Sequence, residues 1–356
     1  MARSERFAAA RTAGRRVLTQ LSGERTTSLP GTLLRSLATA RLSGLALAIF
    51  LTGLAFDLEN QFFLSTTNML GLVRSMTTLS ILAFGETLVL VGGEIDLSLG
   101  AIYGLGAMVC GELWLHGLPF WLSFALALCV GSLAGAVNAF LVTVVGVNSF
   151  VTTLGTLNIA QGLTYLISNS SSINPASSMH EFGVFFDLGA AELPGRVPVQ
   201  VLWLIGVGAV MWVLLHRTLF GFRLAATGAN PAAARAAHLP VRRTKAMAYV
   251  LAGVCAALGG IIDFSLVGAT DPSSGTDLTF TVFAAVIIGG ASLYGGRGSI
   301  VGTVVGALLL EALTNGLTLV GVGTFAQLLF VGTIIIAAVA IDRWSSRIRR
   351  RADVQF

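Results

Sequence analysis

The sequence predicts an all-helical integral membrane protein with about ten transmembrane helices. Three observations predict this class: 54% of the 356 residues are hydrophobic, only 11% are charged, and the mean hydropathy is +0.83. A soluble domain carries roughly 25% charged residues, so this chain cannot expose its whole surface to water. Its apolar runs are long and lack the alternation of an outer-membrane barrel. The predicted spans are therefore helices.

The positions of the basic residues predict the orientation. Three segments contain 8, 6 and 5 of the 22 Lys and Arg residues: the N-terminal tail 1–41, the loop 217–246 and the C-terminal tail 342–356. Lys and Arg mark cytoplasmic loops, so both termini and this loop should lie in the cytoplasm. The largest external loop should be 169–199, which could bear a surface helix.

Ten apolar runs between these anchors define a transmembrane domain from 42 to 341. Their number is even, which agrees with two cytoplasmic termini. The first and eighth runs are short for a bilayer, so eight or nine crossings with re-entrant pieces is the competing count. The predicted spans are 42–56, 74–92, 99–115, 121–143, 150–168, 200–216, 247–266, 280–294, 299–318 and 325–341.

A first motif, GGEIDLSLG at 92–100, joins the second and third spans. An acid near the bilayer centre costs roughly 2.5–3.5 kcal/mol, so its carboxylates should lie at an interface, in a vestibule or against helix amides. Asp96 is predicted to cap the next helix, and a gate or substrate contact is the alternative. The motif residues are Gly93, Asp96, Ser98 and Gly100.

A second motif, GGASLYGGRGS at 289–299, precedes the ninth span. Its glycines permit tight turns with positive φ. Glycines four residues apart form helix-contact faces in membranes; this spacing occurs at 298, 302 and 306, and again at 100/104 and 131/135. The motif residues are Gly289, Gly290, Gly295, Gly296 and Gly298.

The loop 217–246 contains a third motif, in which Asn230 and Pro231 are predicted to be the N-cap and first residue of a short helix. The helix should end before Pro240. Its small side chains would fit a groove on another protein, and a solvated loop helix is the alternative. The candidate docking residues are Gly228, Asn230, Pro231, Ala232, Ala233, Arg235 and Leu239.

In this order, the three motifs resemble the permease subunits of bacterial ABC importers, specifically the ribose/xylose/galactose (monosaccharide) permease family. FVTTLGT at 150–156 adds to the resemblance, which covers about 60–341. It implies a type II importer-like homodimer in the lipid bilayer of a bacterial inner membrane and an external sugar-binding protein. It also implies a cytoplasmic ATPase that binds ATP and Mg and docks on the helix from Asn230 to Leu239. The family usually has Gly-Ile-Asn where this chain has His238-Leu239-Pro240, so the left-handed glycine cap is lost.

Several function classes are excluded. The single lysine, Lys245, follows Thr244, so the chain has no Walker A loop of its own. Cys110, Cys129 and Cys255 form no metal or haem spacing, and no metal, cofactor, disulfide, nucleic-acid partner or enzymatic activity is expected of this chain.

The transported sugar would need hydrogen-bonding side chains along its path. Each candidate could instead form an interhelical hydrogen bond. The candidates are Asn68, Asn138, Asn148, Asn158, Gln161, Tyr165, Asn315 and Gln327. The alternative function is a self-contained, ion-coupled secondary transporter that uses the buried carboxylates Glu86, Glu112, Asp263 and Glu311.

Overall fold

We analysed a computed structural model, which describes residues 31–175 and 181–354. The chain divides into two compact units, Met1–Gly44 and Leu45–Phe356. Most of the predicted basic tail 1–41 lies outside the described residues. All the packing discussed below belongs to the second unit.

The elements follow the predicted apolar runs closely. In chain order they are α2 Gly31–Glu59, α3 Thr66–Val91, α4 Leu99–Leu115, α5 Phe120–Phe140, the π-helix η1 Leu141–Val145, α6 Ser149–Ile167, α7 Phe182–Gly189, β1 Glu192–Leu193, β2 Val197–Pro198, α8 Gln200–Arg217, α9 Leu219–Ala229, α10 Pro231–Ala236, α11 Val241–Val267, α12 Leu278–Ile288, α13 Ile300–Leu319 and α14 Thr324–Val354. The helical class is confirmed.

Polar caps set the start of several helices. The side chains of Ser65, Asn148 and Ser299 accept hydrogen bonds from first-turn backbone amides of α3, α6 and α13. Short polar residues do this because their side chains reach the unpaired amides of the first turn. Glycines with positive φ follow two helices, Gly146 after η1 and Gly268 after α11.

Helix α11 is the centre of the second unit and packs against α3, α4 and α5. Small residues allow this close approach, because little hydrophobic force drives helices together inside a membrane. Gly131 and Gly135 of α5 lie against the α11 backbone at Gly253 and Tyr249. The four-residue spacing at 131/135 is therefore confirmed as a packing face.

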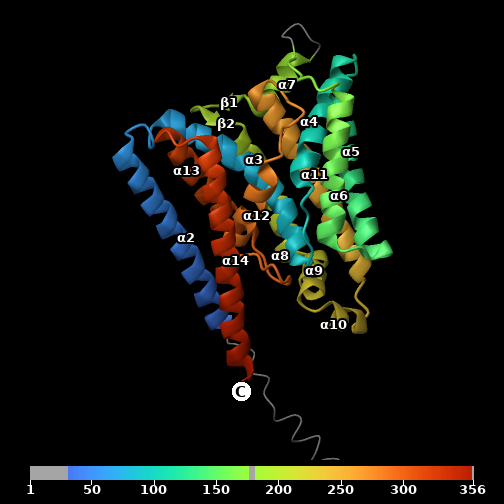
Figure 1. Cartoon of the computed structure of the whole chain (residues 1–356), viewed down its shortest axis with the longest axis vertical. Coiled ribbons are helices and arrows are strands. Elements are labelled where there is room, and N and C mark those ends of the chain that lie inside the picture. The colour runs from blue at the N-terminus through green and yellow to red at the C-terminus, as the bar shows by residue number, and fades with distance from the viewer. Residues whose placement is uncertain (1–30, 176–180, 355–356) are drawn as a thin grey trace, which may run out of the picture. The chain divides into compact units, whose positions relative to one another are not determined.

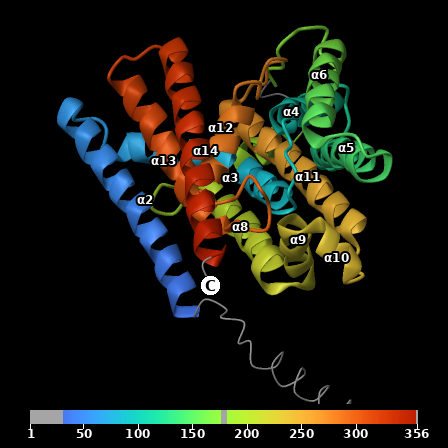
Figure 2. The same cartoon turned by 60° about the horizontal axis from the view of Figure 1, so that its bottom comes forward.

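The two ends of this unit differ (Figure 1). Helix α7 and the β1–β2 hairpin, both from the loop 169–199, lie at one end, and α9 and α10 lie at the other. Seen from the latter end, α9 and α10 lie beside the start of α11 (Figure 2). The loop 169–199 does contain a helix, although Phe185 of α7 is buried against Phe264, with ring centroids 4.8 Å apart.

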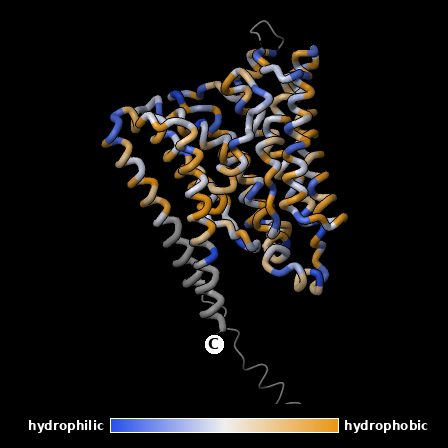
Figure 3. The backbone as a smooth tube through the Cα atoms, in the orientation of Figure 1, coloured by the Kyte–Doolittle hydropathy of each residue, from blue (hydrophilic) through white to orange (hydrophobic). Residues whose placement is uncertain are grey.

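Several helices are long and rich in hydrophobic residues (Figure 3). Among the described residues, five helices have the length and composition of a membrane crossing: α3, α5 with η1, α8, α11 and α13. The predicted span 280–294 is too long, because α12 ends at Ile288 before Gly289 and Gly290. At 1.5 Å per residue α12 covers about 16 Å of a hydrocarbon core about 30 Å thick.

Candidate functional site

The three motifs meet where α9 ends. A Cβ built on Gly228 would overlap the carbonyl oxygen of Val91 and lie 2.7 Å from the amide nitrogen of Gly296. The Gly296 amide donates a hydrogen bond of 2.9 Å to Val91, and Gly93 and Gly295 complete the contact. Backbones can approach this closely only because glycine has no side chain. We call Gly93, Gly228, Gly295 and Gly296 the glycine junction.

The other motif glycines support the loops that form the junction. Gly289 packs on the backbone of Gly302 at the start of α13, and Gly298 packs on the side chain of Val91. Gly290 has a φ of +112°, which an L side chain rarely adopts. The Gly100 amide donates to Thr279 Oγ1 at 3.2 Å and ties α4 to α12.

Helix α10 is capped as the sequence predicts. Asn230 Oδ1 accepts hydrogen bonds from the Ala232 and Ala233 amides at 3.1 and 3.0 Å, and Pro231 is the first helical residue. The helix is shorter than the predicted stretch to Leu239, since it ends at Ala236.

The chain leaves α10 through a left-handed residue, although it has His238 where the family usually has glycine. His238 adopts a φ of +58°, so its backbone takes the left-handed conformation that glycine usually supplies. The Leu239 amide then returns a hydrogen bond of 3.0 Å to the Ala234 carbonyl. Ala232, Ala233 and Arg235 remain exposed on α10.

Asp96 lies in a buried polar network. Its Oδ1 accepts from the Ser98 amide at 2.9 Å and from Ser98 Oγ at 2.5 Å. Asn138 Nδ2 donates to Ser98 Oγ at 2.9 Å and lies 3.3 Å from Asp96 Oδ2, and Thr156 Oγ1 donates to Asn138 Oδ1 at 2.5 Å. The N-cap prediction for Asp96 is wrong, because the cap residue of α4 is Ser98 and Asp96 precedes it by two residues.

The network links the first motif to α5 and α6. Asp96, Ser98 and Asn138 are at most 2% exposed. Glu86 of α3 is also buried, and its Oε1 lies 3.5 Å from the Asp96 amide. Buried polar groups of this kind fix one arrangement of the surrounding helices, because each one needs its partners.

The other candidate path residues are dispersed. Asn68 and Asn315 hydrogen-bond to each other between α3 and α13, at 2.8 and 2.9 Å. Gln161 donates to the Pro272 carbonyl at 2.5 Å. Asn158 is exposed on α6 and donates to Leu154 of its own helix at 2.9 Å. Asn148 caps α6, Tyr165 is exposed, and Gln327 donates to the Val322 carbonyl.

Two of the three remaining candidate carboxylates have local partners. Asp263 Oδ2 accepts a hydrogen bond of 2.5 Å from the Tyr103 hydroxyl. Glu112, at the end of α4, lies 3.5 Å from the His116 ring. Glu311 lies on α13 and is half-buried.

One pairing could not be found from the sequence. Lys245 Nζ lies 2.5 Å from Glu94 Oε1, with both side chains less than a fifth exposed. This ion pair ties the first motif to α11, next to the glycine junction. The sequence offers only weak signals for this ion pair, namely a single lysine and an acid that could lie on the same side of the membrane. No local pattern links them, because 151 positions separate the two residues.

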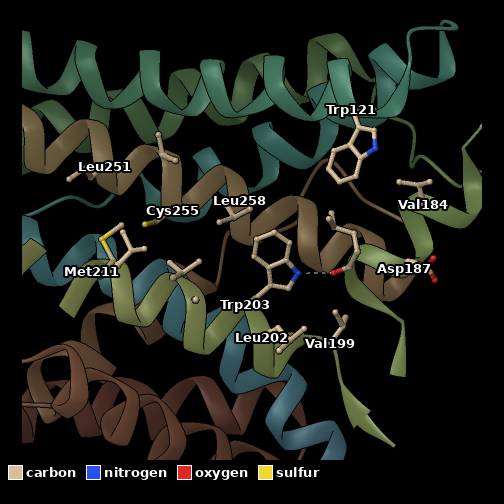
Figure 4. A pocket seen from close by; sticks show the side chains of 15 residues that line it. Trp121, Val184, Asp187, Val199, Leu202, Trp203, Met211, Leu251, Cys255 and Leu258 are labelled. Atoms are coloured by element: carbon tan, nitrogen blue, oxygen red, sulfur yellow. Dashed lines mark hydrogen bonds between the residues drawn. The ribbon is translucent and has the colours of Figure 1, made fainter. Parts of the chain in front are cut away.

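The cavity between α5, α7, α8 and α11 does not suit a sugar (Figure 4). It has a volume of about 760 Å³ and is lined by apolar side chains such as Met211 and Leu258. Its polar groups are few: Asp187 at one end and the Trp203 indole, which already donates to the Leu188 carbonyl at 2.8 Å. A sugar would lose its hydrogen bonds to water there without replacing them.

Comparison with known proteins identifies the family. Residues 68–339 match the model of the branched-chain amino acid transport system / permease component family. The ribose import permease protein RbsC of Bacillus subtilis is 36% identical over 300 residues, which is 84% of this chain and 92% of that protein. The D-allose transport system permease protein AlsC of Escherichia coli is 35% identical over 292 residues, or 82% of this chain and 88% of that protein.

A third relative is the autoinducer 2 import system permease protein LsrD of Klebsiella pneumoniae, 34% identical over 286 residues, or 80% of this chain and 86% of that protein. These relatives favour the transport subunit over a self-contained secondary transporter. They also agree with the motifs at 92–100, 227–245 and 289–299, which lie inside the matched range. The chain belongs to the permease-component family of import systems, and it is a transport subunit, not an enzyme.

Proposed function

We propose that this chain is the membrane-spanning permease of an ATP-driven importer that carries a monosaccharide or a related polyol. The names of the relatives support this substrate class, since they are permeases for ribose, allose and autoinducer 2. The complex would contain two copies of the chain, a cytoplasmic ATPase that binds ATP and Mg, and an external sugar-binding protein.

The glycine junction carries the proposal. Helix α10 is exposed at one end of the unit, and α9, which leads into it, ends against the loops that follow α3 and α12. A displacement of α10 by the ATPase would therefore be transmitted through backbone contacts. Rigid contacts of this kind move elements together instead of absorbing the displacement.

The orientation and assembly belong to the same proposal. The basic loop 217–246 and both termini face the cytoplasm, and the chain makes about ten crossings in which α12 is a short element continued by the loop 289–299. We place α6 toward the second copy or the substrate path, because Asn158 and two glycines are exposed on it. An amide facing lipid would be costly.

Introducing acids on α10 tests the proposal. Ala233→Glu combined with Arg235→Glu should weaken ATPase binding by at least about tenfold, and uptake should fall in parallel. The reason is that like charges or unpaired acids buried at an interface cost several kcal/mol. Both positions are exposed, so insertion of the chain should be unchanged. Co-purification of the ATPase and sugar uptake by membrane vesicles are the measurements.

Arg196→Glu is the matched control for charge reversal, because Arg196 is exposed in the β1–β2 hairpin at the opposite end. It should retain the ATPase. If the α10 double variant retained both the ATPase and uptake, the docking role of α10 would be wrong.

A further inference from the structure

Residues 270–277 join α11 to α12 and turn back into the interior of the unit, and we call them the re-entrant segment. Its first residue forms backbone hydrogen bonds of 2.9 and 3.0 Å with Ile173, which packs on Gly111 near the end of α4. Further along the segment, Gly275 contacts the backbone of Gly100 in the first turn of α4. The stretch of α4 from 111 back to 100 is about 16 Å long, so the segment follows α4 for about this distance.

The contacts of Gly275 place the second half of the segment at membrane depth. The Tyr103 ring lies beside Gly275, and the Tyr103 backbone packs on Gly260 of α11. Helix α11 has the length and composition of a membrane crossing. Gly260 lies well before the end of this helix at Val267, at a distance of about 10 Å along its axis. Gly275 and its neighbours are therefore inside the membrane-spanning part of the unit.

One side of the re-entrant segment is uncovered. Ser273, Thr276 and Asp277 are exposed, and the Asp277 carboxylate caps no amide of α12. Non-helical backbone at membrane depth occurs only where it is buried in protein or lines a water-filled space, and a carboxylate that faces lipid is costly. The exposed side of the segment therefore indicates a water-filled space.

Helix α6 extends this polar surface. Gln161 Nε2 donates a hydrogen bond of 2.5 Å to the Pro272 carbonyl and joins α6 to the segment. At 3.6 residues per turn, Asn158 and Tyr165 lie about 60° and about 40° from Gln161 around the helix axis, both in the same direction. Both are exposed. An amide and a phenol of α6 thus lie beside the hydroxyls and carboxylates of the re-entrant segment.

This surface presents mainly hydrogen-bond acceptors. Ser273 Oγ already donates to Asp271, and Thr276 Oγ1 to the Ser273 carbonyl, so their oxygens remain as acceptors. Asn158 likewise donates within α6 and keeps Oδ1 as an acceptor. Asp271 and Asp277 can only accept when ionised. A matching solute must be rich in donors, as a polyhydroxylated molecule is, and an anion would be repelled by the two acids.

We propose that the exposed sides of the re-entrant segment and of α6 line the path of the transported solute, with Asp277 accepting hydrogen bonds from its hydroxyl groups. The solute class is then a neutral, polyhydroxylated molecule. The statement about transport rests on the proposed function, whereas the water-filled path does not. The experiments below separate the two.

The first experiment measures access of water in the full chain without the ATPase or the binding protein. Cys129 is the exposed native cysteine, so Cys129→Ser is the background for Thr276→Cys and for the control Leu133→Cys, an apolar position on α5 that is 65% exposed. The probe is trimethylammonium-ethyl methanethiosulfonate, which needs a hydrated thiolate, added to membrane fragments open on both faces. Thr276→Cys should react at least about tenfold faster than Leu133→Cys. After unfolding in detergent the two should react equally, which shows that both cysteines are present.

The second experiment tests the charge of the path. Thr276→Cys should react at least about threefold faster with the cationic reagent than with the anionic sulfonato-ethyl methanethiosulfonate, because acids lining a narrow space concentrate cations. Asp277→Asn should reduce this ratio to about half or less. Asp187→Asn is the matched control, since Asp187 is an exposed acid of α7 outside the segment, and it should leave the ratio unchanged.

The third experiment links the path to transport. In the complete importer, modification of Thr276→Cys should lower uptake from a mixture of labelled pentoses and hexoses at least about tenfold, and treatment of Leu133→Cys should leave it unchanged. Equal reaction rates at the two cysteines, a ratio that Asp277→Asn does not change, or undiminished uptake after modification would each overturn the proposal. Uptake without the ATPase, combined with a reactive Thr276→Cys, would instead refute the proposed function and support the path.

Discussion

Replacing Gly228 with alanine should lower the rate of ATP-dependent uptake at least about tenfold. Overpacking at a close backbone contact typically costs about 1–3 kcal/mol and shifts the backbone. The added Cβ would overlap the Val91 carbonyl oxygen and crowd the Gly296 amide. The glycine junction would then open, and α10 would move without moving the loops after α3 and α12. Uptake by vesicles that contain equal amounts of the chain is the measurement.

Gly206→Ala is the matched control. Gly206 lies on α8, and a Cβ built on it meets no atom within 4 Å. It should transport normally. If Gly228→Ala transported as well as Gly206→Ala, the glycine junction would not transmit the motion of α10.

Asn138→Leu should cause the largest loss of stability. Asn138 donates to Ser98 Oγ and Asp96, and accepts from Thr156, at a position that is 0% exposed. Removing one member of a buried charged network costs about 3–5 kcal/mol, and at about 2–4 °C per kcal/mol the thermal midpoint should fall by roughly 6–20 °C. Thermal unfolding of the purified chain in detergent measures this change.

The same substitution at Asn158 is the control, because Asn158 is exposed and hydrogen-bonds only within its own helix. The thermal midpoint of the Asn158→Leu variant should shift by less than a quarter of the shift caused by Asn138→Leu. Equal shifts for the two variants would mean that the buried network does not stabilise the contact between the first motif, α5 and α6.

The positions of the helices could be predicted because hydrophobic runs and caps are local signals. The helix α4, for example, has the predicted bounds 99–115, and Asn230 caps α10 as expected. Errors arose where tertiary packing decides the outcome. Helix α12 ends at Ile288, where Gly289 packs against α13 and Gly290 has a φ of +112°. Asp96 Oδ1 accepts hydrogen bonds from Ser98, which is itself the cap residue of α4.

The motifs could be recognised in the sequence, but their meeting point could not. Gly93, Gly228 and Gly296 are separated by far more residues than any turn or helix spans, so no periodic pattern links them. The Lys245–Glu94 ion pair and the contribution of Thr156 to the network depend on the same long-range packing. The high glycine content predicted close contacts between helices. Which backbone segments touch is decided by the fold.

In the proposed importer, an attached ATPase drives transport through this chain. The most direct measurement reconstitutes the chain in proteoliposomes with its external binding protein, with and without the ATPase, and follows uptake of labelled sugar under ATP or under an imposed ion gradient. We expect uptake only when the ATPase and ATP are both present. Gradient-driven uptake by the chain without the ATPase would contradict this mechanism and assign transport to the carboxylates Glu86, Asp263 and Glu311.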